Sequence, residues 1–211
     1  MYIPNHFRMR NMDDIIELIR NNGFGILITA DGEQPLATHL PFFYDSERHA
    51  LFAHMARANT QWRHLDGQTV LVIFSGPHAY ISSEWYQLPE MVPTWNYTAV
   101  HVYGKANVID DEDKIREILD KLVGFYDPGS RLPEQAHDPF YEKMLKGIVG
   151  FRIDITDIQG AAKMSQNKPL EARLHVVEKL KERGTNGDYN VAESMVKELK
   201  RAGDERSGET V

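Results

Sequence analysis

Four stretches of the sequence carry residue types that packing alone would not select. They combine histidines, amides, hydroxyls and cations with aromatic rings, which are the groups that line sites for planar or anionic small molecules. We therefore expect a ligand site, if the chain has one, to be built from them. The four stretches are HMARANTQW (54–62), PHAYISSEWY (77–86), VPTWNYTAVHVYG (92–104) and KMSQNK (163–168).

Two of these stretches immediately precede a helix expected from the pattern. Asn59 is a suitable N-cap with Arg57 just before it, and the segment from Lys163 to Lys168 leads into a helix at Leu170. Helix N-termini present free N–H groups and favour anions. Each segment fits either a phosphate site or ordinary helix capping, and the sequence leaves both open.

Five aromatic residues fall in the second and third stretches. Their rings could form the apolar walls of a cleft for a planar heteroaromatic ligand. Tryptophan and tyrosine also suit a core or a subunit interface, so that alternative stays open. These residues are Tyr80, Trp85, Tyr86, Trp95 and Tyr97.

The sequence gives less support for a metal site, a serine hydrolase site or a glycine-rich nucleotide-binding loop. The spacing of His54, His78 and His101 matches no metal-binding pattern, and we expect no metal site. Ser82 and Ser83 lie near His78 but lack the G-x-S-x-G context of a hydrolase. The chain has no P-loop and no G-x-G-x-x-G. We assign no catalytic residue.

Composition narrows the class of protein. The chain has 211 residues, no cysteine and a net charge of −7. These values exclude a disulfide framework and argue against general electrostatic binding of nucleic acid. Residues 163–201 alone have a positive excess, with nine Lys/Arg against six Asp/Glu. No apolar run reaches the length of a membrane span and the N-terminus lacks a signal peptide, so we expect a cytoplasmic protein.

The periodicity predicts strands interrupted by helices that do not alternate regularly with them. Gly76-Pro77 is expected to break one strand, and Gly104 to mark a bend or bulge. This order is typical of an α+β fold with a predominantly antiparallel sheet. If such a sheet closes into a small barrel, it has no exposed edge strands. The strands are predicted at 24–30, 35–44, 50–54, 69–74, 78–82, 95–109 and 149–158, and the helices at 12–20, 59–65, 110–126, 138–146, 170–181 and 191–201.

The strand after Pro93 has two mixed faces. Trp95, Tyr97 and His101 alternate with Asn96 and a set of threonines and valines. We expect Val100 and Val102 to mark the core end, and Trp95, Asn96 and Tyr97 the end nearer a cleft or a partner.

The same four stretches resemble the signature segments of the PaiB family, described as FMN-binding negative transcriptional regulators. The resemblance runs from IPNHF (3–7) to QNK near residue 168. It implies a split β-barrel of the flavin-reductase or pyridoxamine-phosphate-oxidase-like type, with flanking helices and a C-terminal helical pair. It also implies a homodimer, FMN as cofactor, and repression of protease synthesis and sporulation. The domains would be a barrel at 1–165, a helical extension at 166–203 and a disordered tail at 204–211.

The split-barrel pattern implies a set of cofactor-binding residues. The strand 36–42 and the segment 52–61 would cradle the flavin, and the strand 98–104 would cross it. Arg57 would be the chief phosphate ligand, with Lys163 and Lys168 completing the site. The implied residues are Thr38, His39, Leu40, His54, Met55, Ala56, Arg57, Asn59, Thr60, Gln61, His78, Trp95, Tyr97, His101, Lys163 and Gln166.

Three functions are consistent with these patterns. In the first, FMN or a similar planar anion is a sensor or structural ligand of a regulator, and the C-terminal helices contact DNA or a partner. In the second, the chain is an FMN-dependent oxidoreductase or a haem-handling enzyme with indirect regulatory effects, and His78, Tyr80 or His101 lies beside the substrate. In the third, it is an interaction module.

Overall fold

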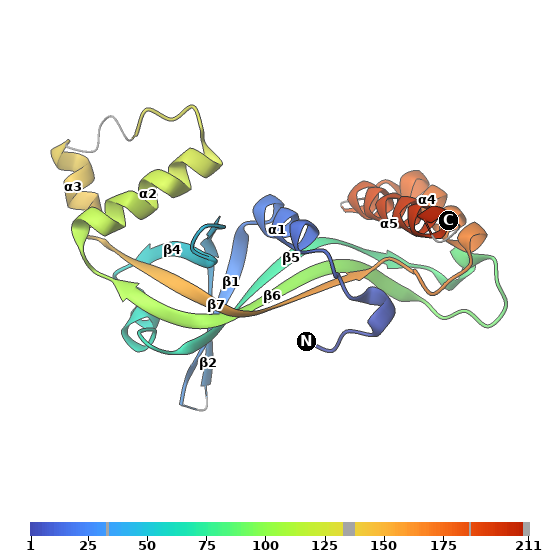
Figure 1. Cartoon of the computed structure of the whole chain (residues 1–211), viewed down its shortest axis with the longest axis horizontal. Coiled ribbons are helices and arrows are strands. Elements are labelled where there is room, and N and C mark those ends of the chain that lie inside the picture. Colours follow the sequence, from blue (N-terminus) through green and yellow to red (C-terminus); the bar gives the residue numbers. More distant parts are fainter. Residues whose placement is uncertain (33, 133–137, 186, 209–211) are drawn as a thin grey trace. The chain divides into compact units, whose positions relative to one another are not determined.

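The computed structural model describes residues 1–32, 34–132, 138–185 and 187–208 (Figure 1). Strands predominate in the first two thirds of the chain and helices at its end. The elements are η1 (Asn5–Phe7), α1 (Met12–Asn21), β1 (Phe24–Asp31), β2 (Gln34–Pro41), β3 (Phe43–Asp45), β4 (Ala50–Ala56), η2 (Thr60–His64), β5 (Thr69–Ile81), η3 (Ser83–Tyr86), β6 (Thr94–Ile109), α2 (Glu112–Tyr126), α3 (Pro139–Leu145), β7 (Ile148–Lys163), α4 (Leu170–Arg183) and α5 (Asp188–Gly208).

The strands form one 7-stranded sheet in the order β2-β1-β5-β6-β7-β4-β3. The β1–β2 hairpin pairs antiparallel from Phe24↔Pro41 to Asp31↔Gln34, and β4 pairs antiparallel with β7. Strand β2, at one end of this order, also packs against β4, which is next to the strand at the other end. The predicted α+β fold with an antiparallel, closed sheet is therefore confirmed.

The chain divides into two compact units, neither continuous in sequence. Unit 1 comprises residues 1–12, 75–99 and 159–211, and unit 2 comprises residues 13–74 and 100–158. Strands β5, β6 and β7 each contribute to both units. The division of the chain into a barrel at 1–165 and a helical extension at 166–203 stays a prediction.

In unit 2, helix α2 covers the strands through one apolar face. Asp111 caps it by accepting a hydrogen bond from the backbone N–H of Lys114, 3.0 Å away. Ile118 and Leu122 then pack against Ala50 and Phe52 of β4. The spacing of three to four residues that predicted this helix thus also gives its buried face.

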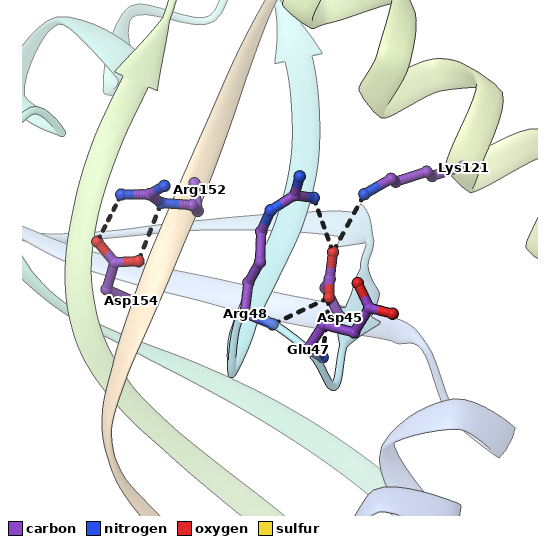
Figure 2. Close-up of polar contacts among 6 residues, drawn as sticks. All are labelled: Asp45, Glu47, Arg48, Lys121, Arg152 and Asp154. Carbon is purple, nitrogen blue, oxygen red and sulfur yellow. Dashed lines mark hydrogen bonds and ion pairs between the residues drawn. The ribbon is translucent and has the colours of Figure 1, made fainter.

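A buried carboxylate ties the same helix to the turn between β3 and β4 (Figure 2). Asp45 accepts hydrogen bonds from Nη1 of Arg48 at 3.0 Å and from Nζ of Lys121 on α2 at 3.1 Å. The backbone N–H groups of Glu47 and Arg48 donate to its other oxygen. Burial acts to raise the pKa of Asp45, but these hydrogen bonds outweigh it and the pKa is lowered.

In unit 1, α4 and α5 lie side by side (Figure 1) and share an apolar core with the end of β5 and with η3. Val176, Leu180, Val191 and Met195 are fully buried in it. The connection between the helices turns at Gly184, whose φ of 60° lies in the left-handed region. The predicted C-terminal helical pair is confirmed as an element of structure.

The predicted break in the strand at Gly76-Pro77 is wrong. Strand β5 runs without a break through Gly76-Pro77, because β1 pairs only with residues 71–73 and the missing N–H of Pro77 costs no bond to β1. Up to Gly76, the buried residues of β5 have even numbers, and from Ala79 onward they have odd numbers. One extra residue between these two positions, as in a β-bulge, produces this change. At Gly104, where a bend or bulge was predicted, two strands approach closely: a Cβ there would lie 2.5 Å from the carbonyl oxygen of Asp154.

Element boundaries also differ near the C-terminus. Strand β7 continues to Lys163, five residues beyond the predicted end at 158. Helix α5 begins at Asp188 and ends at Gly208, so it includes residues 204–208 of the predicted disordered tail. Residues 209–211 of that tail lie outside the described residues. No helix in the described ranges is long and apolar enough to span a membrane.

Candidate functional site

Strand β6 has one buried and one accessible face. Asn96, Thr98, Val100 and Val102 are buried, whereas their neighbours on the other face are half-buried or exposed. The accessible face therefore carries Trp95, Tyr97, Ala99, His101 and Tyr103, the set that period-two alternation predicts.

Three aromatic side chains in unit 1 group at the surface. Trp95 is 54% exposed, and its ring lies 6.0 Å from that of Tyr80 and 6.2 Å from that of His78. Tyr80 is itself 42% exposed. We call His78, Tyr80 and Trp95 the aromatic group. Such rings present an accessible apolar surface with polar edges, suited to a planar ligand or a protein partner.

Two of the three other aromatic candidates, Trp85 and Tyr86, have structural roles. Tyr86 is buried, and burial raises the pKa of its hydroxyl. Trp85 lies under the guanidinium of Arg183, 4.7 Å from the ring centre. Neither ring belongs to the accessible surface formed by the aromatic group.

Asn96, predicted at the strand end nearer a cleft or a partner, has its side chain in the protein interior. It is fully buried in unit 1, where its Oδ1 accepts a hydrogen bond from Ser165 at 3.1 Å and its Nδ2 contacts the sulfur of Met195. Ser165 in turn pairs with the hydroxyl of Tyr86 at 2.8 Å. Polar groups can be buried when they are hydrogen-bonded in this way. The alternating strand pattern alone does not predict that Asn96 has such partners.

A polar network in unit 2 joins β1, β2 and η2. Asn59 caps η2, as predicted, by accepting from the backbone N–H of Gln61 at 3.0 Å. The Nδ2 of Asn59 donates to Oγ1 of Thr38, which donates to Oε1 of Gln61 at 2.5 Å. Gln61 Nε2 donates to Thr29 Oγ1 at 3.0 Å. Three residues implied by the resemblance are therefore brought together, and the buried Gln61 fixes their geometry.

The neighbouring cation, Arg57, is held by its own chain. Its Nη2 donates to Oδ1 of Asp110 at 2.5 Å and to the carbonyl oxygen of Ile148 at 3.0 Å. Its Nε donates to the carbonyl oxygen of Lys146 at 3.1 Å, and its guanidinium lies 5.8 Å from the ring centre of Trp62. Sequence reasoning missed Asp110, because nothing in the chain between residues 57 and 110 signals the pairing.

Two histidines on the candidate strands keep a ring nitrogen free of protein partners. The Nδ1 atoms of His54 and His101 are buried and have no hydrogen-bond partner among the described residues. Burial lowers the pKa of both imidazoles, which favours the neutral form. No group of three or more His, Asp or Glu side chains within the described ranges could hold a metal ion. Both nitrogens therefore lack a hydrogen-bond partner in the described part of the chain, and both are shielded from solvent.

The predicted residues from the fourth stretch make local contacts in unit 1. Lys163 donates a hydrogen bond to Oγ1 of Thr94, and burial lowers its pKa. Gln166 accepts from the backbone N–H of Met164 at 2.7 Å and donates to the carbonyl oxygen of Ala162 at 2.6 Å. Gln166 thus shapes the turn that precedes α4.

The sixteen implied residues divide between the two units. Leu40 and Met55 are buried and pack in the protein interior, whereas His39, Ala56 and Thr60 are exposed. Unit 1 contains His78, Trp95, Tyr97, Lys163 and Gln166, and unit 2 contains the other eleven. Within unit 2, side-chain hydrogen bonds join Thr38, Asn59 and Gln61, and the backbone N–H of Asn59 donates to the carbonyl oxygen of Ala56 at 2.8 Å.

Comparisons with known proteins agree with the fold. Residues 1–157 match the model of a family described as "Putative FMN-binding domain". The chain is 39% identical over 207 residues to "Protease synthase and sporulation protein PAI 2" of Bacillus subtilis, covering 95% of this chain and 99% of that protein.

Solved structures with low sequence identity share the architecture. An FAD and haem binding protein from Mycobacterium smegmatis has a TM-score of 0.62 at 16% identity, covering 79% of this chain and 78% of that one. The flavocytochrome Anf3 from Azotobacter vinelandii has a TM-score of 0.61 at 14% identity, covering 76% and 72%. With the closed antiparallel sheet, these likenesses confirm the predicted split β-barrel fold.

Proposed function

Because the chain belongs to the PaiB family of proteins with an FMN-binding domain, we propose that it is an FMN-binding negative regulator of transcription, acting on protease synthesis and sporulation. FMN serves in it as a sensor or structural ligand. The observation that carries the proposal is the similarity to PAI 2 over almost the whole length of both chains. We place its action in the cytoplasm.

The polar residues of unit 2 fit an FMN group. A flavin ring edge presents carbonyl and N–H groups, which suit the unpartnered Nδ1 of His54 and the hydroxyl and amide groups of Thr38 and Asn59. Arg57 would hold the phosphate, through the fork geometry that a guanidinium offers. When bound, FMN supplies a redox-active ring, and these residues would orient it.

A homodimer is the second part of the proposal. The aromatic group places exposed Tyr80 and Trp95 on the accessible face of unit 1. Exposed large aromatic side chains that gather in one place are typical of interfaces. Light scattering after size exclusion tests this part: a mass near twice 24.2 kDa is expected, and a mass equal to one chain would contradict it.

Flavin-dependent oxidoreduction is the alternative function. The specific observation that favours it is His101, a half-buried residue of β6 whose Nδ1 is buried and has no hydrogen-bond partner among the described residues. Anaerobic mixing of the FMN-loaded protein with NADH or NADPH separates the two functions. A sensor is expected to show no rapid bleaching of the flavin absorbance, whereas bleaching within seconds would favour the enzyme.

A further inference from the structure

Helix α4 begins without a side-chain cap. Its N-cap is Pro169, which makes no capping hydrogen bond, and the residue before it is Lys168. The helix has 14 residues, so its first-turn N–H groups and its dipole together favour an anion. A helix start of this kind is common, and it becomes informative only with independent evidence for a ligand.

That evidence is Arg173, in the next turn of the same helix. Its side chain is buried, with 6% of the residue exposed, and its Nε and Nη2 have no hydrogen-bond partner among the described residues. Helical side chains tilt toward the N-terminus, which directs the guanidinium toward the start of α4. Burying a cation with unsatisfied donors is costly, and an anionic acceptor would offset that cost.

The carboxylate whose field acts on Arg173 makes no hydrogen bond with it. Glu198 on α5 favours the charged form of Arg173 through its field, although burial, the larger effect, lowers the pKa of the guanidinium. The oxygens of Glu198 are engaged by Nε2 of Gln166 at 3.5 Å and by Nη1 of Arg201 at 3.1 Å. The first turn of α4 also carries the exposed Glu171. Neither acid makes a hydrogen bond to Arg173 in the described part of the chain.

We propose that Arg173, Lys168 and the first turn of α4 form a binding site for a phosphate group. A planar guanidinium binds two oxygens of a phosphate at once, and helix N–H groups can bind a third. Lys168 adds a second positive charge; its Nζ lies 5.9 Å from the ring centre of Tyr86, a residue of the η3 segment that packs against α4. The inference does not depend on flavin binding, because all of these residues belong to unit 1.

Thermal unfolding of the full chain tests the site. Sodium phosphate, at ten times its Kd, is expected to raise the Tm by roughly 3–5 °C above the value in sodium chloride of equal ionic strength. Arg173→Met should abolish the phosphate-specific rise. The matched variant Lys179→Met, at an exposed ion pair with Glu182 on the same helix, should retain it. Equal Tm values in the two salts, or a full rise in Arg173→Met, would overturn the proposal.

Lys168→Gln gives a second test if Arg173→Met does not fold. Phosphate affinity, followed by ³¹P line broadening, should weaken several-fold in this variant, and unchanged affinity would contradict the site. Competition then identifies the source of the phosphate. FMN that displaces inorganic phosphate, where riboflavin does not, assigns the site to the flavin phosphate; displacement by neither assigns it to free phosphate.

Discussion

The guanidinium of Arg57 and the carboxylate of Asp110 form an ion pair in unit 2, with 2.5 Å between Nη2 and Oδ1. The two residues come from the end of β4 and the residues just after β6. Asp110 is therefore paired with Arg57, the residue that the family resemblance implies as a phosphate ligand. An anionic ligand at Arg57 must compete with this carboxylate.

Asp110→Asn is predicted to strengthen FMN binding several-fold. The substitution keeps the shape of the side chain but removes the negative charge that competes for Arg57. Arg57 retains its bonds to the carbonyl oxygens of Lys146 and Ile148, so its position is preserved. The measurement is a fluorescence titration of FMN, with Asp66→Asn as a control on an exposed acid of the same unit. Weaker binding by Asp110→Asn would exclude Arg57 as the phosphate ligand.

Acid is predicted to weaken the connection between α4 and α5. Asp188 is buried, and its hydrogen bonds with Arg183, above all, and with Thr185 lower its pKa from 3.8 to about 2. Because the folded pKa is depressed, this stabilisation is fully present above about pH 4 and is lost as the pH falls through 2.

The corresponding variant is Asp188→Asn. It should lower the free energy of unfolding by about 2 kcal/mol at neutral pH and lose this difference from wild type near pH 2. Glu182→Gln, which removes an exposed ion pair with Lys179, should cost less than about 0.5 kcal/mol. Urea unfolding at several pH values measures both. A pH-independent cost for Asp188→Asn would show that the charge is not responsible.

Two glycines of unit 2 give opposite predictions. At Gly104, a Cβ would lie 2.5 Å from the carbonyl oxygen of Asp154 and 2.6 Å from Cγ2 of Ile153. Gly104→Ala should therefore destabilise the protein by about 2–3 kcal/mol, because the backbone of β7 cannot move freely. At Gly124, inside α2, a Cβ meets no atom within 4 Å. Gly124→Ala should stabilise by about 0.5–1 kcal/mol. Equal effects in thermal unfolding would refute the close approach.

Nucleic-acid binding, if direct, is predicted to use the C-terminal helical pair. Neutralising Lys197, Lys200 and Arg201 together should weaken DNA binding and reduce its dependence on salt concentration. Lys105→Gln with Lys114→Gln, at exposed positions of unit 2, should leave both unchanged. Electrophoretic mobility shifts at several salt concentrations measure this. Equal binding by both variants would remove α5 from the DNA contact.

The sequence predicted the elements whose pattern is local. The helical spacing of Ile115, Ile118 and Leu122 placed α2, and the alternation around Val100 and Val102 placed the buried face of β6. Capping by Asn59 was also readable, since it depends on contacts two residues apart.

Features that depend on distant contacts were not predictable. Pro77 remains in a strand because β1 does not pair with that part of β5, and Asn96 is buried because Ser165, sixty-nine residues away, satisfies its side chain. The pairing of Arg57 with Asp110 spans fifty-three residues. Such contacts depend on the order of the strands in the sheet, and this order cannot be predicted from local sequence patterns.

The binding of FMN is the central claim, and direct titration of the purified full-length chain tests it. We predict that FMN fluorescence is quenched to a 1:1 end point per chain, with a Kd on the order of micromolar or tighter. Thr38→Val with Asn59→Ala, which removes two polar groups of the unit 2 network, should weaken binding at least tenfold. No quenching of FMN by the wild-type chain at concentrations of about 100 µM would contradict the account.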